Sequence, residues 1–385
     1  MSIEKLLIKR LSFLEQIDLE TERYRNKTGE AVPNVSGWKI SNDYRTIMMK
    51  NFDYFPYISE NPIDYTYSYS LDSNLRKLIL KKLGGGSNTS ILLAPNNTIS
   101  LVNLINFVAN FCPHQIGLLL PCYFTIPNLL KDRSLSYVSL SMIRTMNGYR
   151  LPIEDIKKHN CKVLIITNPV FSTGQYLCEE DILFLKDFLA KKNHVICDES
   201  LAAPKHELVR DLGAFPHFLS IYSPHKFIHF NSFKFSCVLH NEMFENFFDQ
   251  WNDVYSGGLN ITNIHAINHY LSENYQKLLD IFYDFMGKNF FRVQEMVNHF
   301  YKFQTDAEVI GDYLCIYNQE IPYKYANNLN FIKKVITHTQ SVFYPGCLHG
   351  FQKEHGFVFR INLASYGSRC SNALLKILDY LSNIT

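Results

Sequence analysis

Four short groups of residues stand out because their side chains can bind or react with a small molecule. They are Asn168-Pro169 followed by Thr173-Gly174, then Cys197-Asp198-Glu199, then Ser223-Pro224-His225-Lys226, and finally Phe359-Arg360-Ile361. Together they offer an amide, a carboxylate, an amine and a guanidinium. Lys226 follows an apolar run and precedes Phe227 and Ile228, a setting that would lower the pKa of its amine and make it a nucleophile.

The spacing of the first three groups predicts that they meet in space. Asp198 follows Asn168 by 30 residues and Lys226 follows Asp198 by 28, each the length of one strand–helix unit. Each group comes directly after a β-branched or aromatic run, at 163–166, 195–196 and 218–222. The carboxyl ends of neighbouring parallel strands form the edge of an open α/β sheet at which ligands bind. The sequence therefore predicts a ligand site at this edge.

The surrounding chain supplies the elements that would position this edge. Helical and strand patterns alternate from about residue 75 to residue 240, and three further strands are expected at 90–95, 115–121 and 136–141. Such alternation predicts a mostly parallel sheet with helices on both faces. An amphipathic helix is expected at 3–26, a helical stretch at 265–298, and further strands at 311–317 and 357–363.

In their order and spacing, the four groups resemble the aminotransferase class I/II family, the aspartate aminotransferase-like enzymes of fold type I that use pyridoxal phosphate (PLP). The resemblance runs from about Asn34 to the C-terminus. It implies an α/β fold with a mostly parallel seven-stranded sheet sandwiched by helices, in which 235–241 is an antiparallel strand. It also implies a smaller α+β domain built from both chain ends. The expected parts are an N-terminal helix and arm at 1–74, a large PLP-binding domain at 75–262 and a C-terminal small domain at 263–385.

The resemblance implies a role for each residue that would face the cofactor ring. Lys226 would form the Schiff base with PLP, Asp198 would pair with the protonated pyridine nitrogen, and Asn168 would donate from its amide to the phenolic oxygen. Tyr123 would stack on the ring, and Glu199 would play a structural role. Each has a simpler alternative: a lysine at a strand end, a helix-capping aspartate, an Asn-Pro turn and a tyrosine packed in the core.

The family resemblance also assigns residues to the phosphate of PLP. Ser223 and Lys234 match family phosphate-binding positions, and Asn97 and Thr98 precede an expected helix at 100–110 whose first N–H groups would point at the phosphate. Simple helix capping is the alternative for Asn97 and Thr98. Tyr65 or Tyr67, together with Asn263, would reach the phosphate held by a partner subunit, so the resemblance implies a homodimer with shared active sites.

For the substrate, the resemblance assigns the α-carboxylate to Arg360 through a two-pronged hydrogen bond. An arginine in an apolar strand is costly to bury unless it binds a partner, which favours this role. The arm around Gly37 and Trp38 would close over the substrate, with Gly37 near its carboxylate. The alternative for Gly37 is an ordinary turn glycine.

Several positions depart from the family pattern. Leu201 stands where a tyrosine usually donates to the phenolic oxygen, Lys234 replaces an arginine, and Pro95-Asn96-Asn97 replaces a turn of small residues. His225 beside Lys226 resembles decarboxylases and lyases of the same fold. The first hypothesis is an aminotransferase acting on an α-amino acid. The alternative is another PLP reaction at Cα or Cβ (decarboxylation, elimination, replacement or oxidation), possible in specialised biosynthesis, and the third is a binding protein that kept the fold without turnover.

Composition limits the classes of protein and of binding partner that the chain is expected to represent. The chain has 385 residues, of which 46% are hydrophobic and 19% charged, and this is typical of a soluble globular protein. The net charge of +2 gives no reason to expect nucleic acid or a membrane surface as partner. No apolar run is long enough to span a bilayer, and no signal peptide is expected. The nine cysteines form no C-x-x-C pair, so we expect buried thiols, no metal and a reducing, cytoplasmic compartment.

Overall fold

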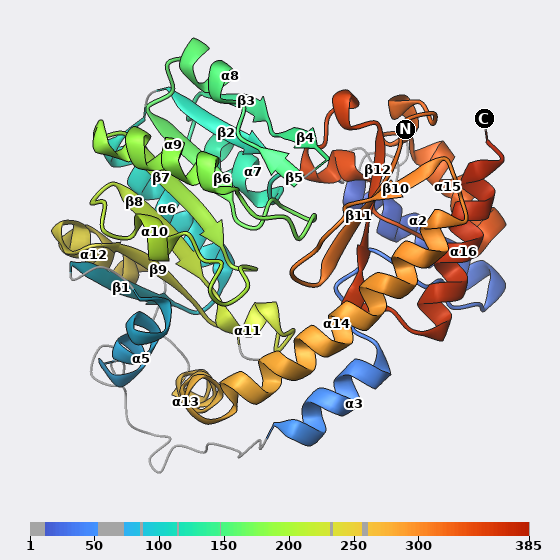
Figure 1. Ribbon diagram of the computed structural model, residues 1–385, viewed down its shortest axis with the longest axis horizontal. Coiled ribbons are helices and arrows are strands. Elements are labelled where there is room, and N and C mark those ends of the chain that lie inside the picture. The colour runs from blue at the N-terminus through green and yellow to red at the C-terminus, as the bar shows by residue number, and fades with distance from the viewer. Residues whose placement is uncertain are drawn as a thin grey trace, which may run out of the picture. The chain divides into compact units, whose positions relative to one another are not determined.

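The computed structural model describes residues 12–52, 73–84, 88–113, 115–146, 148–231, 234–255 and 261–384. The chain divides into two compact units (Figure 1). The larger comprises Ile47–Phe171 and Gln175–Tyr283, and the smaller comprises Met1–Thr46, Ser172–Gly174 and Asp284–Thr385. Each unit is described by itself below.

A seven-stranded sheet forms the centre of the larger unit. Across the sheet the strands are β1 (Thr89–Ala94), β9 (Ser236–Asn241), β8 (Phe218–Tyr222), β7 (His194–Glu199), β6 (Val163–Thr167), β2 (Ile116–Leu120) and β3 (Tyr137–Ser141). The five strands from β8 to β3 run parallel, and β9 is antiparallel to both β8 and β1. The predicted fold class, including the antiparallel strand after Lys226, is confirmed.

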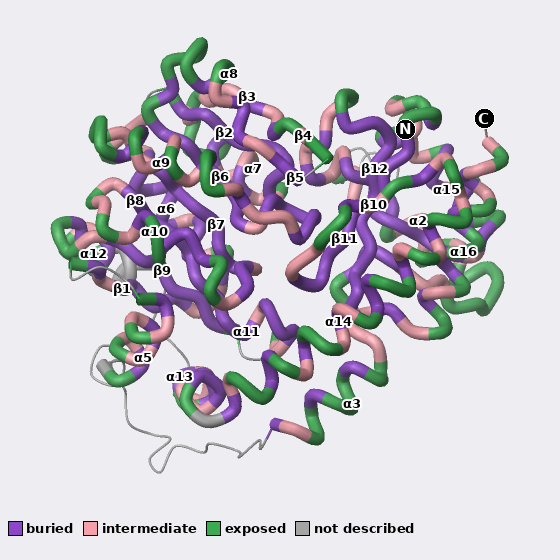
Figure 2. The backbone as a smooth tube through the Cα atoms, in the orientation of Figure 1, coloured by how far each residue is buried: buried purple, intermediate pink, exposed green. Residues whose placement is uncertain are grey.

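The central strands of this sheet are largely apolar because helices cover both faces. Every residue of β2, β6 and β8 is buried, and Figure 2 shows the central strands as the buried part of the unit. The covering helix α6 (Asn97–Phe111) packs against β1, β8 and β9. The other elements of this unit are α5 (Ser73–Leu83), α7 (Thr125–Asp132), β4 (Ile143–Thr145), β5 (Gly148–Arg150), α8 (Ile153–Lys158), α9 (Glu179–Ala190), α10 (Val209–Leu212), α11 (Pro224–Phe227), α12 (Glu245–Tyr255) and α13 (Ile261–His269).

The smaller unit is built on an antiparallel three-stranded sheet. Its strands are β10 (Phe303–Thr305), β11 (Tyr313–Asn318) and β12 (Phe357–Asn362), with β11 in the middle. Helix α15 (Leu329–Thr339) packs against α2 (Phe13–Thr28) and α16 (Ser368–Ser382). Helix α2 corresponds to the amphipathic helix expected near the N-terminus, and a capping box between Ser12 and Glu15 fixes its start.

The observed unit boundaries differ from the boundaries expected at 74/75 and 262/263. The helical stretch expected at 265–298 is divided into α13, a π-helical turn at Tyr270–Asn274 and α14 (Tyr275–Asn298). Both α13 and the π-helical turn pack against α5 of the larger unit, and that unit therefore extends to Tyr283. Helix α3 (Asn42–Asn51) crosses the other boundary, at 46/47.

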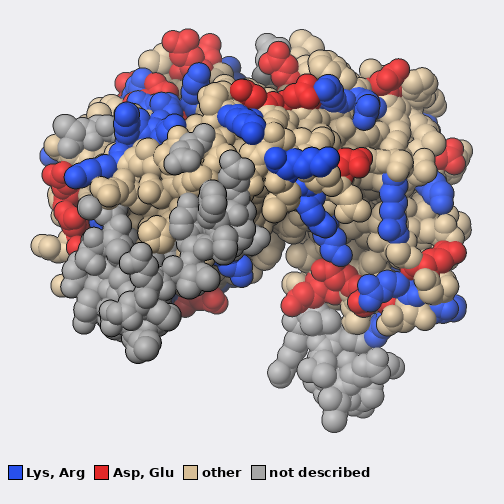
Figure 3. Space-filling model, turned by 90° about the horizontal axis from the view of Figure 1, so that it is seen from below, with Lys and Arg blue, Asp and Glu red and all other residues tan. Residues whose placement is uncertain are grey.

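Charged side chains are interspersed on the surface. On the face seen in Figure 3, lysine and arginine lie among aspartate and glutamate without a large area of one sign, in keeping with the small net charge. Within the described residues, no helix combines the length and hydropathy needed to cross a bilayer.

Candidate active site

Three polar groups meet at one edge of the large sheet. Thr167 at the end of β6 pairs with Asp198 of β7, and Asp198 in turn pairs with Ile221 of β8. The backbone N–H of Asn168 donates to the Asp198 carbonyl at 3.0 Å. The register therefore brings Asn168, Asp198 and the chain leading into Ser223 to the same carboxyl edge, where the spacing placed them.

Lys226 lies on α11, the single helical turn that follows β8. The lysine is half-buried, whereas its neighbours His225, Phe227 and Ile228 are buried. Phe227 packs on Phe282 with ring centroids 4.3 Å apart. Burial, and then the nearby charge of Lys226, lower the pKa of His225 to about 3, so this imidazole is neutral at physiological pH. The apolar setting expected for Lys226 is present.

Asp198 is a buried acidic residue near the end of β7. The side chain is 7% exposed, and one of its oxygens accepts the Ser200 N–H at 3.1 Å. No ion pair to Asp198 occurs among the described residues. Burial, followed by the charge of Asp198, raises the pKa of the adjacent Cys122 thiol to about 12. A buried carboxylate in this state is suited to pair with a cationic ligand atom.

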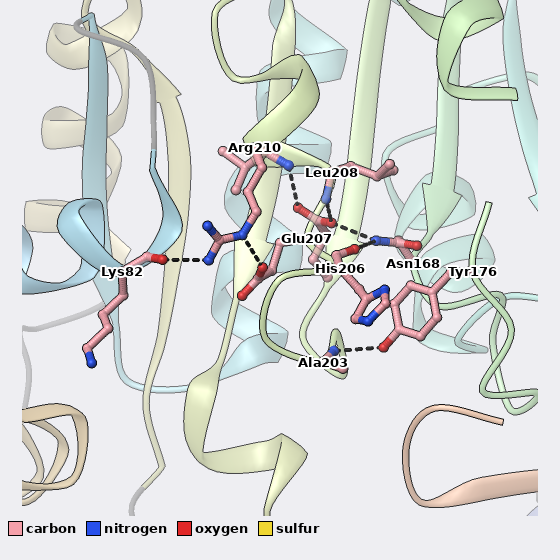
Figure 4. A network of polar contacts seen from close by, with 10 residues as sticks. Lys82, Asn168, Tyr176, Ala203, His206, Glu207, Leu208 and Arg210 are labelled. Carbon is pink, nitrogen blue, oxygen red and sulfur yellow. Dashed lines mark hydrogen bonds and ion pairs between the residues drawn. The ribbon is translucent and has the colours of Figure 1, made fainter. Parts of the chain in front are cut away.

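Asn168 is held by a network that the sequence did not reveal (Figure 4). Its Nδ2 donates to Oε1 of Glu199 and to the carbonyl oxygen of His206, both at 2.9 Å. Glu199 also accepts the N–H groups of Leu208 and Val209. Burial raises the pKa of Glu199 to about 8, while the hydrogen bond from Asn168 opposes this shift. In this arrangement, the two amide hydrogens of Asn168 are directed at Glu199 and His206.

Buried hydroxyl groups gather at the amino end of α6. Ser236 Oγ lies 3.0 Å from Ser223 Oγ and 2.9 Å from Ser100 Oγ, and Asn97 Oδ1 lies 3.4 Å from both Ser223 Oγ and Ser236 Oγ. Asn97 Nδ2 is buried without a hydrogen-bond partner among the described residues. Asn96, rather than Asn97 or Thr98, caps the helix by accepting the Ile99 N–H.

Sequence reasoning selected Ser223 and Asn97 from this cluster but missed Ser100 and Ser236. Ser100 follows Asn97 by three residues on the same helix face, a signal that was available. Ser236 joins the cluster only because β9 returns beside β8, which no local pattern predicts.

The other cofactor candidates are less enclosed. Lys234 is exposed, and its backbone carbonyl accepts a hydrogen bond from Asn263 at 2.8 Å. Thr98 is exposed. Tyr123 is half-buried and packs beside Phe124 and Phe171. Tyr65 and Tyr67 lie outside the described residues.

The smaller unit holds Arg360 in an aromatic corner. Arg360 is 2% exposed, and its guanidinium carbon lies 4.5 Å from the Tyr313 ring centroid and 4.8 Å from that of Trp38. The two rings meet edge to face at 5.5 Å. Nε donates to the Ser36 carbonyl at 3.0 Å and Nη1 to Ser172 Oγ at 3.2 Å. Within the described residues no carboxylate pairs with Arg360, which leaves a buried cation whose Nη2 makes no hydrogen bond.

The segment Ser172–Gly174 belongs to this smaller unit and explains part of the Thr173-Gly174 signal. Gly174 has a φ of +67°, and a Cβ there would lie 2.8 Å from the Tyr313 carbonyl oxygen, so only glycine fits without strain. Gly37 is buried and its carbonyl accepts Asn362 Nδ2 at 2.7 Å, whereas Trp38 is 42% exposed. Gly37, Trp38 and Arg360 therefore belong to one cluster of the smaller unit.

No His, Cys, Asp and Glu cluster suited to a metal ion occurs among the residues that the structure describes. All nine cysteines are free thiols.

Comparison with known proteins identifies the fold. No protein-family model and no curated protein matches the sequence. Among solved structures, the aspartate aminotransferase of Thermotoga maritima superposes with a TM-score of 0.75 at 17% identity, covering 99% of this chain and 100% of that one. Kynurenine aminotransferase of Pyrococcus horikoshii, solved with PMP, gives 0.73 at 13% identity, covering 99% of this chain and 97% of that one. Cystalysin of Treponema denticola, which contains PLP, gives 0.70 at 17% identity over 95% and 93%. The chain thus has the fold type I architecture of these enzymes.

Proposed function

We propose that this chain is a PLP-dependent aminotransferase that acts on an α-amino acid through a Schiff base with Lys226. The observation that carries the proposal is the convergence of Asn168, Asp198 and Ser223 at one sheet edge, with Lys226 on the turn that follows. The fold shared with aspartate aminotransferase over the whole chain supports it. A homodimer with shared active sites and a cytoplasmic location are part of the same proposal, and the nine free thiols support a reducing compartment.

The buried groups at this edge fit the parts of PLP. The Asp198 carboxylate, which has no cation among the described residues, fits a protonated ring nitrogen. The unpartnered Asn97 Nδ2 and the Ser223 hydroxyl lie at the amino end of α6, where the first N–H groups of the helix favour a phosphate. Thr98, Lys234, Tyr67 and a stacking Tyr123 complete the proposed cofactor contacts.

When bound, PLP supplies an electron sink for the bond that breaks at the substrate Cα. Asp198 would keep the ring nitrogen protonated because an ionised carboxylate favours a nearby cation. The Lys226 amine would accept the Cα proton as a general base. The buried residues around Lys226 would exclude water from this proton transfer.

Arg360 is proposed to bind the α-carboxylate of the substrate. Two of its five N–H groups are used by Ser36 and Ser172, and the others include both hydrogens of Nη2. A carboxylate would add the anion that this buried guanidinium lacks among the described residues. Trp38 and Tyr313 cover the guanidinium and lower the local dielectric, which strengthens such a pair. Gly37 and Trp38 would contact the substrate from the same arm.

The alternative is another PLP reaction at Cα or Cβ in specialised biosynthesis, such as decarboxylation, elimination, replacement or oxidation. Two observations favour it: Leu201 stands where the family places a tyrosine, and His225 adjoins Lys226. Cystalysin and a PLP-bound C-S lyase of Staphylococcus hominis also share this fold, with TM-scores of 0.70 and 0.65.

The test is the near-visible absorption spectrum of the PLP-loaded protein, before and after a pool of amino acids is added without a keto acid. Amino transfer predicts loss of the aldehyde-form absorption and its return when a keto acid is added. Retained absorption with release of ammonia or carbon dioxide would support the alternative reaction. If supplied PLP produces no protein-bound absorption, or if Lys226→Ala produces the same covalent absorption, the role of Lys226 is wrong.

A further inference from the structure

Two histidines lie side by side at the amino edge of the large sheet. Strands β7 and β8 pair from Val195 and Phe218 onward, so His194 and His217, one residue earlier on each chain segment, are also neighbours. Their ring centroids are 4.5 Å apart and their ring planes are inclined by 60°. Asp198 lies near the opposite, carboxyl end of β7. The histidine pair is therefore separate from the candidate active site.

Both rings have nitrogen atoms that are not used within the protein. Nδ1 of His217 is buried and has no hydrogen-bond partner among the described residues. No hydrogen bond formed by the described part of the chain reaches a ring nitrogen of His194 either. Buried polar atoms in folded proteins nearly always have a partner, so the His217 nitrogen is unusual. A neutral imidazole nitrogen without a hydrogen is an acceptor of hydrogen bonds and a ligand for metal ions.

The separation of the rings matches that of two imidazoles that bind one metal ion. A metal–nitrogen bond of about 2.1 Å places the ion about 3.2 Å from each ring centroid, and an angle of about 90° to 110° at the ion then places the two centroids about 4.5 to 5.2 Å apart. The observed 4.5 Å between His194 and His217 lies within this range. Both side chains are half-buried, so solvent can reach an ion held between them.

The surroundings of the pair favour a cation. The Phe107 ring lies with its centroid 6.0 Å from that of His194, and Phe107 stands about one turn before α6 ends at Phe111. The carboxyl end of a helix carries a partial negative charge, which stabilises a cation close to the last turn. The described residues supply no third histidine, cysteine or carboxylate to this pair, so water molecules would complete the coordination of the ion.

We propose that His194 and His217 form a binding site for a divalent transition-metal ion, with one nitrogen of each ring as a ligand. The class of ion follows from the donor atoms. Imidazole nitrogen binds nickel, copper and zinc well, whereas magnesium and calcium require oxygen ligands. The site does not depend on the proposed use of PLP, so either proposal can fail without the other.

The experiment is equilibrium dialysis of the chain against Ni²⁺, and against Mg²⁺ as the ion that the site should reject. Loss of an outer-shell partner alone weakens metal binding by about 10–100-fold. His194→Asn and His217→Asn each remove one of only two ligands, so each should weaken Ni²⁺ binding by at least about tenfold. The nine free thiols can also bind Ni²⁺, and the comparison between variants separates that background from the site.

His299→Asn is the matched control. His299 is an exposed histidine of the smaller unit, and its Nδ1 lies 2.8 Å from the Glu295 carbonyl oxygen. This variant should bind Ni²⁺ as the unaltered chain does. Unchanged binding in His194→Asn or in His217→Asn, an equal loss in His299→Asn, or equal binding of Mg²⁺ and Ni²⁺ by the unaltered chain would overturn the proposal.

A second measurement needs no substitution, so it applies even if the asparagine variants do not fold. Cu²⁺ added to the unaltered chain in less than equimolar amount should occupy the strongest site first, and imidazole ligands suit this ion. Its electron paramagnetic resonance spectrum should then show hyperfine coupling to the nitrogens of two rings. Coupling to a single nitrogen, or a spectrum typical of sulfur ligands, would contradict the pair as the binding site.

Discussion

Replacing Arg360 by methionine is expected to weaken carboxylate binding strongly while changing the free energy of unfolding by no more than about 3 kcal/mol. The variant loses two hydrogen bonds from a charged donor, to Ser36 and Ser172, worth about 1.5–3 kcal/mol each. It also loses contacts with two aromatic rings, worth about 0.5–2 kcal/mol each. Against this, burial of a cation without a carboxylate costs several kcal/mol, which methionine avoids while filling the space.

These opposing contributions leave a net change in the free energy of unfolding within about 3 kcal/mol. Binding should respond differently, because a bidentate pair with the substrate carboxylate disappears. Two charge-assisted hydrogen bonds amount to about 3–6 kcal/mol, which corresponds to a loss of roughly 10²–10⁴ in affinity.

The assay is urea-induced unfolding with and without 3-phenylpropionate, a carboxylate that lacks an amino group and cannot react. At a concentration of about 100 times the Kd of the unaltered chain, the ligand should raise the free energy of unfolding of that chain by about 2.7 kcal/mol and of Arg360→Met by at most about 0.4 kcal/mol. Arg369→Met is the matched control, since Arg369 is an exposed arginine of the same unit. Equal stabilisation of Arg360→Met and the unaltered chain would refute the role of Arg360. Unfolding of the variant without ligand would show that Arg360 is mainly structural.

Three further changes test the larger unit. Asp198→Asn keeps a side-chain oxygen for the Ser200 N–H but removes the charge, so the rate of amino transfer should fall about 10²–10³-fold with little change in stability; an undiminished rate would refute its pairing with the ring. Ser236→Ala removes the hydroxyl that bonds Ser223 and Ser100, and the Kd for PLP, measured by equilibrium titration, should rise about fivefold; an unchanged Kd would exclude this cluster from phosphate binding. Burial lowers the pKa of His194 to about 4, of His240 to about 4 and of His225 to about 3. The unfolded chain therefore binds more protons below about pH 6.5, and the free energy of unfolding should fall by up to about 1.4 kcal/mol per pH unit for each histidine as pH drops towards 4. Urea unfolding at pH 7 and pH 5 measures this slope, and His194→Asn should reduce it.

Much of the large sheet could be predicted from the sequence because its strands are buried on both faces. Such strands form continuous apolar runs, and each observed strand lies within one or two residues of its expected run, except where β7 extends to Glu199. The π-helical turn at Tyr270–Asn274 could not be predicted, since apolar residues recur with helical period through it. The assignment of α13 to the larger unit depends on packing against α5, which is distant in sequence.

The candidate site likewise contains some features that could be predicted from the sequence and others that could not. Residues at strand ends, such as Asp198 and Ser223, follow from the spacing of strand–helix units. The orientation of the Asn168 amide does not, because it depends on Glu199 and on a backbone carbonyl 38 residues away, at His206. A sequence pattern shows that an amide is present but not which of its two atoms is already used.

Some of the departures from the family pattern lie at the phenolic oxygen of the proposed cofactor. Asp198 and Lys226, which would act on the ring nitrogen and on the substrate Cα, have the residue types that the family resemblance requires. At the phenolic oxygen, Leu201 supplies no donor and the amide hydrogens of Asn168 are used by Glu199 and His206. Electron withdrawal through the ring nitrogen would then be retained, while hydrogen bonding at the phenolic oxygen would differ from the family pattern.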